Sequence, residues 1–428
     1  MIAQPKPVFA SDFGTSYYKF GPWWLMKTGP NVVENRGYFP KISKVSAEVR
    51  GITAKEVVVG EEVAEYLESR ADLARLYYPM RNGIIERNDQ RGWRVVKELV
   101  RYGLLKYHPG RTDTTGLPFS GFLVVAALAA QAPTYMYERF FEIHEEVNSE
   151  EGGNLVRAVT IIPQPLAVAI AEKAVACMVV EAGHGNTQIT PISRDVIRAA
   201  LIPLNRGGSD SDRITAQILK DLGYPDLARE EKFVRMFKEM VGLLPLDLDK
   251  AISWAKDHPG ALQSTFRIPG TTVEVEMGDK AWQRFLIGEF FFNPAHELFE
   301  SYYTRGFVSP RDTLVGGEVI PGNVTLAEAI RLSISKVPVE LQTSIAKRVI
   351  LSGGAFNWSV PKGLEGIAAD SPTKLKHMLR SVGLDVEPKL VSDPQFSVWR
   401  GSIVYGMAVS EEIAWDWSKM EGWYHIGR

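Results

Sequence analysis

The chain has 428 residues, of which 45% are hydrophobic and 23% charged, and this composition excludes collagen, a coiled-coil rod and a disordered chain. The 49 basic and 51 acidic residues give a formal net charge of −2, whereas proteins that wrap nucleic acid usually carry a basic excess. The single cysteine, Cys177, allows no internal disulfide, which fits a reducing compartment. The N-terminus lacks a secretory hydrophobic region, and the apolar run 122–130 is too short to span a bilayer. We therefore expect a globular protein of two or three domains, with no transmembrane segment and no nucleic-acid partner.

In chain order, the first predicted unit is a hairpin at 8–21 whose turn, DFGTS at 12–16, is centred on Gly14. A second hairpin at 176–192 turns through EAGHGNT at 181–187, and a strand at 348–351 leads into SGGA at 352–355. Because two turns with an acid and glycines lie about 170 residues apart, we expect a duplicated fold that contributes one turn from each half.

Between these units, short apolar runs alternate with amphipathic stretches, which predicts an α/β fold. Apolar residues at helical spacing predict helices at 90–106, 211–223, 226–242 and 325–337. The run 122–130 predicts a buried strand, and 266–275 predicts a hairpin with a Pro-Gly turn.

The two glycine turns are suited to phosphate, because backbone N–H groups can approach its oxygens where no Cβ intervenes. The candidate phosphate ligands are Gly14, Thr15, Ser16 and Lys19 in the first turn, and Gly183, His184, Gly185, Asn186 and Thr187 in the second. Asp12 and Glu181, at the strand ends, are carboxylates of the kind that hold a divalent cation directly or through water. Taken singly, each turn is equally an ordinary hairpin turn with polar residues at its tip.

Other nucleotide and metal motifs are absent from the sequence. There is no G-x-x-x-x-G-K-[ST] loop, and no G-x-G-x-x-G opens a helix after a strand. The seven histidines are scattered without zinc-ligand spacing.

Beyond the two turns, six segments contribute to a resemblance that runs from residue 12 to residue 402. They are 57–63 (VVVGEEV), 78–85 (YPMRNGII), 205–210 (NRGGSD), 234–239 (VRMFKE), 352–354 (SGG) and 396–402 (FSVWRGS). In order and spacing, the chain resembles actin and the actin-like ATPases, most closely the crenarchaeal actins. The resemblance implies a cytoplasmic, cytoskeletal ATPase with bound ATP or ADP and Mg²⁺.

The resemblance also implies an actin-like, duplicated ribonuclease-H-like fold. Two large domains, each with an inserted small lobe, would surround a central nucleotide cleft. The first large domain would comprise 1–36, 81–152 and 397–428, with its lobe at 37–80. The second would comprise 153–207 and 297–396, with its lobe at 208–296.

By the same resemblance, a set of residues would surround the adenosine. These are Gly208, Asp210, Arg235, Lys238, Glu239, Gly353, Gly354, Ala355, Asn357, Trp358 and Gln395. The sequence departs from the family in its second turn, where Glu181 and His184 stand at positions that are usually aspartates. His184 would donate to a phosphate or would only hydrogen-bond within the turn.

Hydrolysis needs a water in line with the γ-phosphate and a cation that neutralises charge. In the family, a Gln or Glu on the helix after a strand-Ala-Pro segment positions that water. On the predicted helix 134–147, Glu142 is the best match and Glu138 the competitor, although either could be a solvated helix face. Asp12 and Glu181 would hold Mg²⁺, mainly through water, so the expected catalytic residues are Glu142, Glu181 and Asp12.

The resemblance further implies a homopolymer filament, in which hydrolysis times turnover, and small companion regulatory proteins. Two segments are candidates for the head-to-tail contact: the variable loop 39–54, and 301–324, which contains the exposed-looking Tyr302, Tyr303, Phe307 and Val308. The alternatives are a non-polymerising actin-fold ATPase, a small-molecule kinase and a chaperone ATPase. The last has no substrate-binding domain in this sequence.

Overall fold

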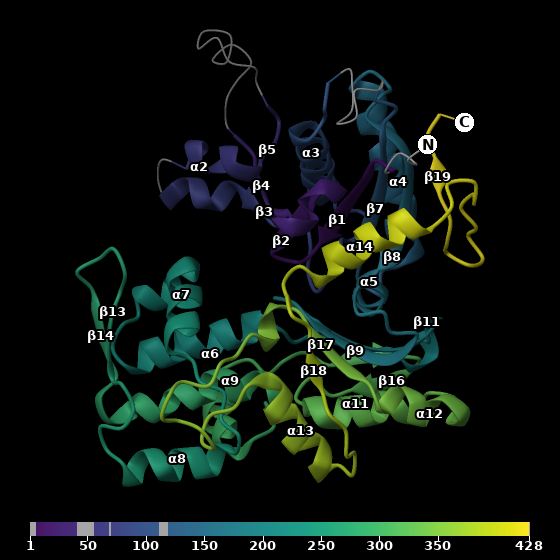
Figure 1. Cartoon of the computed structure of the whole chain (residues 1–428). Coiled ribbons are helices and arrows are strands. Elements are labelled where there is room, and N and C mark those ends of the chain that lie inside the picture. Colours follow the sequence, from purple (N-terminus) through teal and green to yellow (C-terminus); the bar gives the residue numbers. More distant parts are fainter. Residues whose placement is uncertain (1–5, 41–54, 68–69, 111–118, 428) are drawn as a thin grey trace. The chain divides into compact units, whose positions relative to one another are not determined.

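A computed structural model describes residues 6–40, 55–67, 70–110 and 119–427 (Figure 1). The variable loop 39–54 therefore lies almost wholly outside the described residues. The chain divides into two compact units. Unit 1 comprises Met1–Ala174 and Phe396–Arg428, and unit 2 comprises Val175–Gln395. Each unit is built around its own mixed sheet.

The sheet of unit 1 has the strand order β19-β8-β7-β1-β2-β3. Its strands are β1 (Val8–Phe13), β2 (Tyr17–Pro22), β3 (Asn31–Glu34), β7 (Phe122–Leu128), β8 (Val156–Pro163) and β19 (Tyr424–His425). The first three strands form an antiparallel meander, whereas β7 runs parallel to β1 and β8 parallel to β7. All seven residues of β7 are buried, as expected for a parallel strand that is covered on both faces.

Helices cover the two faces of this sheet. They are α3 (Gln90–Lys106), α4 (Thr134–Glu150), α5 (Gln164–Ala171) and α14 (Ser397–Ala408). The α3 and α4 helices pack together, and α14 packs on α5, β1 and β7 (Figure 1). Because side chains alternate along a strand, Phe9 and Phe13 join the core with α3 and α4. Val8 contacts α14 at Gly406. Asp12 is four residues further along β1, so its side chain is on the same face of the sheet, which α5 and α14 cover.

The part of the chain between β3 and α3 forms a small three-stranded sheet. It has the order β5-β4-β6, with β4 at Gly37–Tyr38, β5 at Val58–Val59 and β6 at Leu76–Tyr77. Tyr38, Val58 and Val63 form its own small core, and Val63 begins the short helix α2 (Val63–Tyr66).

The sheet of unit 2 has the order β11-β10-β9-β17-β18, and β12 also pairs with β10. Its strands are β9 (Ala176–Ala182), β10 (Thr187–Ser193), β11 (Asp195–Val196), β12 (Ile202–Leu204), β17 (Val349–Ser352) and β18 (Lys389–Leu390). The β9–β10 hairpin is antiparallel, while β17 runs parallel to β9 and β18 parallel to β17.

The two sheets therefore repeat one pattern. Each begins with a hairpin, extends it on one side by antiparallel strands, and adds two later strands on the other side that run parallel to the first. This arrangement confirms the two predicted hairpins and the predicted α/β class.

Unit 2 contains two groups of helices. The first group packs around the sheet and comprises α11 (Leu326–Ser335), α12 (Val339–Ala346) and α13 (Ser371–Ser381). The second group has a separate core and comprises α6 (Gly208–Asp221), α7 (Glu231–Val241), α8 (Leu248–Asp257) and α9 (Arg284–Phe292), with the hairpin of β13 (Thr265–Arg267) and β14 (Glu274–Glu276). A buried ion pair joins the groups, with Lys374 Nζ 2.6 Å from a Glu289 carboxylate oxygen.

Several predicted boundaries differ from the structure. The helix expected from 211 begins at Gly208, because the Asp210 carboxylate accepts the Gly207 amide (2.9 Å) at its start. The helix expected at 226–242 is interrupted at Glu230, between a short 3₁₀ turn and α7. The boundary expected at 152/153 also shifts, since β8 pairs with β7 and unit 1 continues to Ala174.

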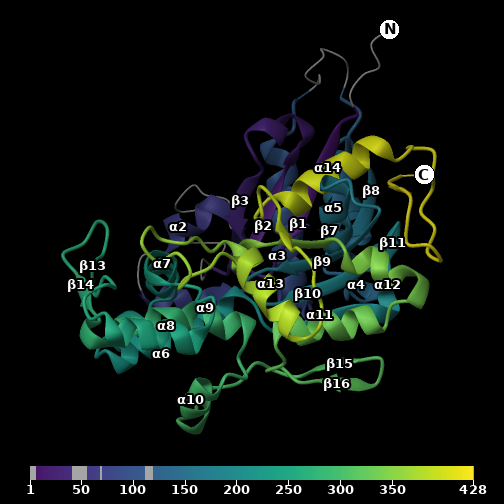
Figure 2. The same ribbon diagram turned by 60° about the horizontal axis from the view of Figure 1, so that its bottom comes forward.

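The segment 301–324 contains the short helix α10 (Glu300–Thr304) and a hairpin of β15 (Thr313–Val315) and β16 (Glu318–Ile320). Figure 2 shows this hairpin projecting from the rest of unit 2. The predicted exposure of Tyr302 is wrong, because Tyr302 is buried in the core of the second helix group, and Tyr303 and Phe307 pack against that core. Val308 is exposed as predicted. Among the described residues, no helix is both long and apolar enough to cross a membrane.

Candidate functional site

The first glycine turn is closed by its own backbone and by two neighbouring segments. The Gly14 amide donates to the Tyr17 carbonyl (3.0 Å), and Asn35 Nδ2 donates to the Gly14 carbonyl (2.8 Å). The Gly83 amide donates to the Thr15 hydroxyl oxygen (3.0 Å), which leaves the hydroxyl proton able to reach another acceptor. A Cβ on Gly14 would come within 3.1 Å of the Tyr17 carbonyl oxygen. The turn is thus a tight, held loop at the end of β1.

Asp12 lies at the end of β1 and is only 2% exposed. Its carboxylate accepts from Lys19 Nζ (3.0 Å), directly opposite on β2, and from Gln164 Nε2 (2.9 Å). Both contacts provide hydrogen-bond donors to a buried carboxylate. Lys19, predicted as a phosphate ligand, has the Asp12 carboxylate as a partner in this structure.

Gln164 is a site residue that the sequence reasoning missed. It is the first residue of α5, is buried, and also donates to the Phe13 carbonyl (3.2 Å). A usable signal was the polar residue in Pro163-Gln164-Pro165, directly after an apolar strand. The carboxyl ends of neighbouring parallel strands share one edge of a sheet, where ligands of α/β proteins bind.

Glu142 does not belong to this loop. It lies on α4 with its side chain 58% exposed and pairs with Arg139 (2.9 Å). Glu138, the competitor, lines the same open surface hollow. Both glutamates lie on α4, the helix that follows Ala132-Pro133. The α4 helix contacts the loop through the rings of Phe140 and Phe13 (4.9 Å between centroids), whereas α5 contacts it through the hydrogen bonds of Gln164.

The second turn is held by the start of α6. The Gly208 amide donates to the Gly183 carbonyl (3.0 Å), and the Ser209 amide donates to the His184 carbonyl (2.7 Å). Gly207 has no room for a side chain, because a Cβ would lie 2.6 Å from the His184 carbonyl oxygen. The sequence NRGGSD is thus required to pack against the turn.

Two predicted phosphate ligands of this turn have other surroundings. Thr187 is fully buried, and its hydroxyl donates to the Arg206 carbonyl (2.8 Å), so it stabilises the turn and offers no hydroxyl proton to a ligand. Asn186 is 6% exposed, and its Nδ2 atom has no hydrogen-bond partner within the described ranges. Such an orphaned donor is a group that a ligand or water can satisfy.

The Glu181 carboxylate accepts from Gln188 Nε2 (2.9 Å), its direct partner across the β9–β10 hairpin. His184 Nδ1 lies 3.7 Å from Asp212, and the other oxygen of Asp212 lies 2.7 Å from Lys238 Nζ. Burial lowers the pKa of His184 to about 4, against the opposing effect of Asp212. The imidazole is therefore neutral at pH 7, with one nitrogen beside a carboxylate.

The residues predicted around adenosine gather in two places within unit 2. Gly353 has φ +98°, and a Cβ there would lie 2.1 Å from the Ala182 carbonyl oxygen, so only glycine fits beside β9. Gly354 adjoins Gln395, and Trp358 Nε1 donates to the Ala355 carbonyl (2.9 Å).

Trp358 also reaches the end of α7, where a Cβ on Gly242 would come within 2.9 Å of its ring. The α7 helix carries Arg235, Lys238 and the exposed Glu239, and Asn357 is exposed next to Trp358. The structure thus brings Trp358 to the C-terminal end of α7, while Gly353 lies against β9.

Asp210 fits the predicted adenosine set poorly. It is 4% exposed, and its carboxylate accepts from the Gly207 amide (2.9 Å) and from Arg213 Nη1 (3.0 Å). Burial raises the pKa of Asp210, while these contacts and the charge of Arg206 lower it. Its side chain therefore serves the start of α6.

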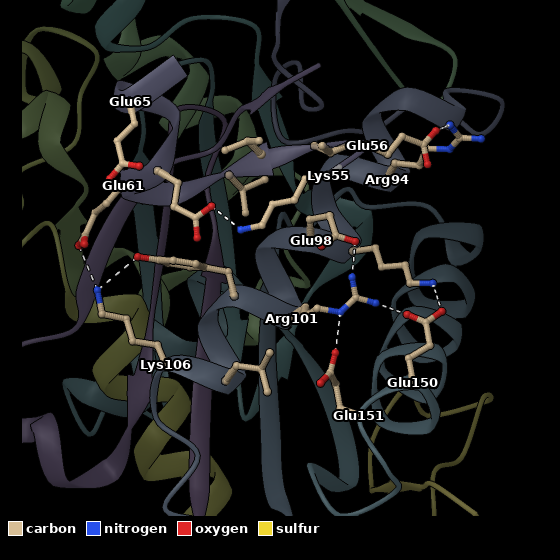
Figure 3. Close-up of a pocket in the computed structure, with 17 residues that line it drawn as sticks. Lys55, Glu56, Glu61, Glu65, Arg94, Glu98, Arg101, Lys106, Glu150 and Glu151 are labelled. Atoms are coloured by element: carbon tan, nitrogen blue, oxygen red, sulfur yellow. Dashed lines mark hydrogen bonds and ion pairs between the residues drawn. The ribbon is translucent and has the colours of Figure 1, made fainter. Parts of the chain in front are cut away.

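A large hollow of about 1050 Å³ lies in unit 1, between α3, α4 and the segment 55–65 (Figure 3). Arg101 reaches Glu98, Glu150 and Glu151, and Lys106 reaches Glu61 (3.0 Å). Because its cations are paired with carboxylates of the same hollow, this surface is an ion-pair network and a poor site for an anion.

No cluster of three His, Cys, Asp or Glu side chains able to hold a metal occurs among the residues that the structure describes. A divalent cation at Asp12 or Glu181 would therefore take most of its ligands from water and phosphate oxygens. That arrangement suits Mg²⁺, which usually keeps several waters. The carboxylates present are compatible with such a cation.

A scan against protein-family models finds no model that matches the chain. What the chain itself provides is two glycine loops of the same construction. One ends β1 of unit 1 and the other ends β9 of unit 2. Each follows a carboxylate that is held by a side chain on the next strand.

Proposed function

We propose that the chain is an actin-like protein that binds ATP with Mg²⁺, hydrolyses it and assembles into filaments. The observation that carries this proposal is the repeated sheet pattern, with an acid-and-glycine loop at the same position in each unit. Such a repeat is the architecture of a duplicated ribonuclease-H-like fold. The motif order from residue 12 to residue 402 supports the same family.

In this proposal the two loops bind the phosphates through backbone amides. The amides of Thr15 and Ser16 and those of His184 to Asn186 supply the N–H groups, while the Gly14 and Gly183 amides close the two turns by donating to the Tyr17 and Asn186 carbonyls (both 3.0 Å). The orphaned Nδ2 of Asn186 is a further donor for an anion. Mg²⁺, when bound, would neutralise phosphate charge, with Asp12 and Glu181 as its carboxylates through water.

Gln164 is the proposed water-positioning residue in place of Glu142. Its amide is buried and fixed on the Asp12 carboxylate and the Phe13 carbonyl. A glutamine cannot take a proton at neutral pH, so its contribution is orientation of the attacking water. Its position beside the first loop supports this role, whereas Glu142 is held by Arg139 on an exposed helix face.

For assembly, the proposed contact is the β15–β16 hairpin. Leu314 and Val319 are 71% and 62% exposed and stand directly opposite each other across the two strands. An exposed apolar pair on a projecting hairpin is suited to a heterologous contact with a second copy. The exposed Val308 lies on the same inserted segment.

The test combines phosphate release with sedimentation. Purified protein with ATP and Mg²⁺ should release phosphate and form a pellet, and electron microscopy should show filaments. The double variant Leu314→Ser/Val319→Ser should stay in the supernatant while binding ATP normally, with a stability change within about 0.5 kcal/mol. As a matched control, Val175→Ser removes an equally exposed valine (64%) from unit 2 and should leave pelleting unchanged.

The outcomes separate the alternatives. Phosphate release without a pellet at any temperature or salt concentration would indicate a non-polymerising ATPase. ATP consumption that depends on an added small hydroxyl compound would indicate a kinase. Absence of ATP binding by calorimetry would overturn the proposal.

A further inference from the structure

We propose that the segment 205–213 links nucleotide occupancy of the second glycine loop to the position of the β15–β16 hairpin, with Arg206 as the central positioning residue. The identity of the nucleotide rests on the proposed function. The linkage itself rests on the contacts that this segment makes with the second glycine loop and with the base of the hairpin.

On one side, the segment is bound to the loop through its backbone. The Arg206 carbonyl accepts the Thr187 hydroxyl (2.8 Å). The Gly208 and Ser209 amides donate to the carbonyls of Gly183 and His184 (3.0 and 2.7 Å). A ligand that shifts the peptides of this loop must therefore shift Arg206 and its neighbours, or break these bonds.

On the other side, the same residues hold the base of the hairpin. Arg206 Nη1 donates to the carbonyls of Gly322 and Val324 (2.9 and 2.8 Å). Asn205 Nδ2 donates to the Asp312 carbonyl (3.0 Å), and an Asp312 carboxylate oxygen accepts the Gly322 amide (2.8 Å). Both strands of the hairpin are thus fixed to consecutive residues at their base.

The base of the hairpin is also tightly packed. A Cβ on Gly322 would lie 2.0 Å from the Pro310 carbonyl oxygen, so the segments before and after the hairpin touch here with no space for a side chain. Movement of one segment is therefore transmitted to the other, as expected where packed elements have few alternative arrangements.

The burial of Arg206 makes this connection sensitive to displacement. Its side chain is 0% exposed, and its Nε and Nη2 atoms have no hydrogen-bond partner in the described part of the chain. Its Nη1 atom donates to the two carbonyls at the base of the hairpin. Loss of those acceptors would leave a buried charge poorly compensated, which is strongly unfavourable. The loop, Arg206 and the base of the hairpin should therefore move as one element.

Residues 205–213 make a second connection to the segment 301–324, through Arg213. Arg213 Nη1 donates to Asp210 (3.0 Å), which also caps α6. The Arg213 guanidinium also hydrogen-bonds the Val308 carbonyl and lies 4.8 Å from the Phe307 ring centroid. The segment 205–213 thus contacts 301–324 in two places, at Phe307 and Val308 through Arg213 and at the base of the hairpin through Asn205 and Arg206.

The test is amide hydrogen exchange on the full chain, with Leu314→Ser/Val319→Ser as background so that assembly does not protect the hairpin. With saturating Mg²⁺ and ATP, exchange at 311–324 should slow about fivefold or more, at the lower end of typical couplings. Arg206→Met should abolish that slowing while protection at 183–187 remains. Asp312→Ala, an exposed change at the base of the hairpin, is the milder variant should Arg206→Met fail to fold. Arg229→Met, which removes an exposed arginine of unit 2, is the control and should behave as the background.

Without nucleotide, Asp312→Ala should also speed exchange of the Gly208 and Ser209 amides relative to the background. This arm is independent of ATP. If neither variant changes exchange across the segment while ATP still protects 183–187, the linkage is wrong and the proposed function stands. If ATP protects nothing but Asp312→Ala alters the Gly208 and Ser209 amides, the proposed nucleotide fails and the mechanical linkage stands.

Discussion

The two glycine loops occupy the same position in their sheets but balance charge in different ways. In the first loop, the buried Asp12 pairs with Lys19 on the adjacent strand of its own hairpin. In the second loop, Glu181 pairs with the neutral Gln188. Two cations act on His184 of this loop, and both belong to α7: Arg235, and Lys238, which is held by Asp212 of α6.

In the first loop, a cation of the same hairpin balances the charge of the carboxylate. In the second loop, the neighbouring cations come from helices that are inserted later in the chain. A change in α6 or α7 should therefore affect the second loop, and a change in α5 the first. Variants of each loop should therefore differ in the size of their effects.

The largest effect is expected at the first loop. Asp12→Asn removes the charge that Lys19 and Gln164 face, and we expect ATP hydrolysis to fall by about 10²–10³-fold. Glu181→Gln should cost less, because Glu181 pairs with a neutral amide. Single-turnover phosphate release measures both. A larger loss for Glu181→Gln would reverse the proposed ranking of the loops.

Gln164→Ala tests which residue positions the water. We expect the hydrolysis rate to fall about 10- to 100-fold, because the orienting amide is lost, while ATP affinity stays within severalfold. Glu142→Ala is the matched control and should keep near wild-type turnover, since its carboxylate is exposed and paired with Arg139. Slower hydrolysis in Glu142→Ala than in Gln164→Ala would return the role to α4.

One histidine in each unit titrates at low pH, the buried His144 in unit 1 and the half-buried His184 in unit 2. Burial lowers the pKa of His144 in unit 1 and of His184 in unit 2 to about 4, below the ordinary value near 6.5. The unfolded chain therefore binds more protons between about pH 6.5 and 4. Stability is full above this window and decreases as the pH falls through it, with a slope of at most about 1.4 kcal/mol per pH unit for each histidine.

His184→Gln should remove one of these two contributions and flatten the pH dependence of the unfolding temperature. Differential scanning calorimetry from pH 7 to pH 4 measures the difference from wild type, so other titrating groups cancel. A curve parallel to wild type would show that His184 is not held neutral in the folded protein.

The smallest effect is expected in the charged hollow of Figure 3. Glu61→Gln removes the partner of Lys106 from an exposed pair, and we expect a change in unfolding free energy of about 0.5 kcal/mol or less. Chemical denaturation at low and high salt measures it. A loss well above about 1 kcal/mol would mean that this surface network contributes as strongly as a buried pair.

The hairpins could be predicted because their signals are local. Alternation along 8–21 and 176–192, with glycine at the turn, suffices to predict β1–β2 and β9–β10. Gln164 could not be found in this way, since its contact with Asp12 depends on β7 lying between β1 and β8. Two residues that meet although they are 152 positions apart in the chain leave no periodic trace in the sequence.

Side-chain roles were also beyond a sequence reading. The buried hydroxyl of Thr187 looked like a phosphate donor until its acceptor, the Arg206 carbonyl, was seen. Tyr302 looked exposed in an aromatic surface segment, but it is buried beside Phe299 in the core of the second helix group. The acceptor of Thr187 lies 19 residues away, and the core that buries Tyr302 includes residues of helices as distant as α6, so the nearby sequence could identify neither.

The path of the chain has a consequence for synthesis on the ribosome. Unit 2 is continuous from 175 to 395, whereas unit 1 needs α14, whose Trp399 donates to the Gly21 carbonyl (3.2 Å) and whose Gly401 packs directly on Ala167. The part of unit 1 that is translated first therefore cannot close until α14 has been synthesised. Unit 2 can fold before it, and until then the face of β1 and β7 that α14 covers stays exposed to chaperones.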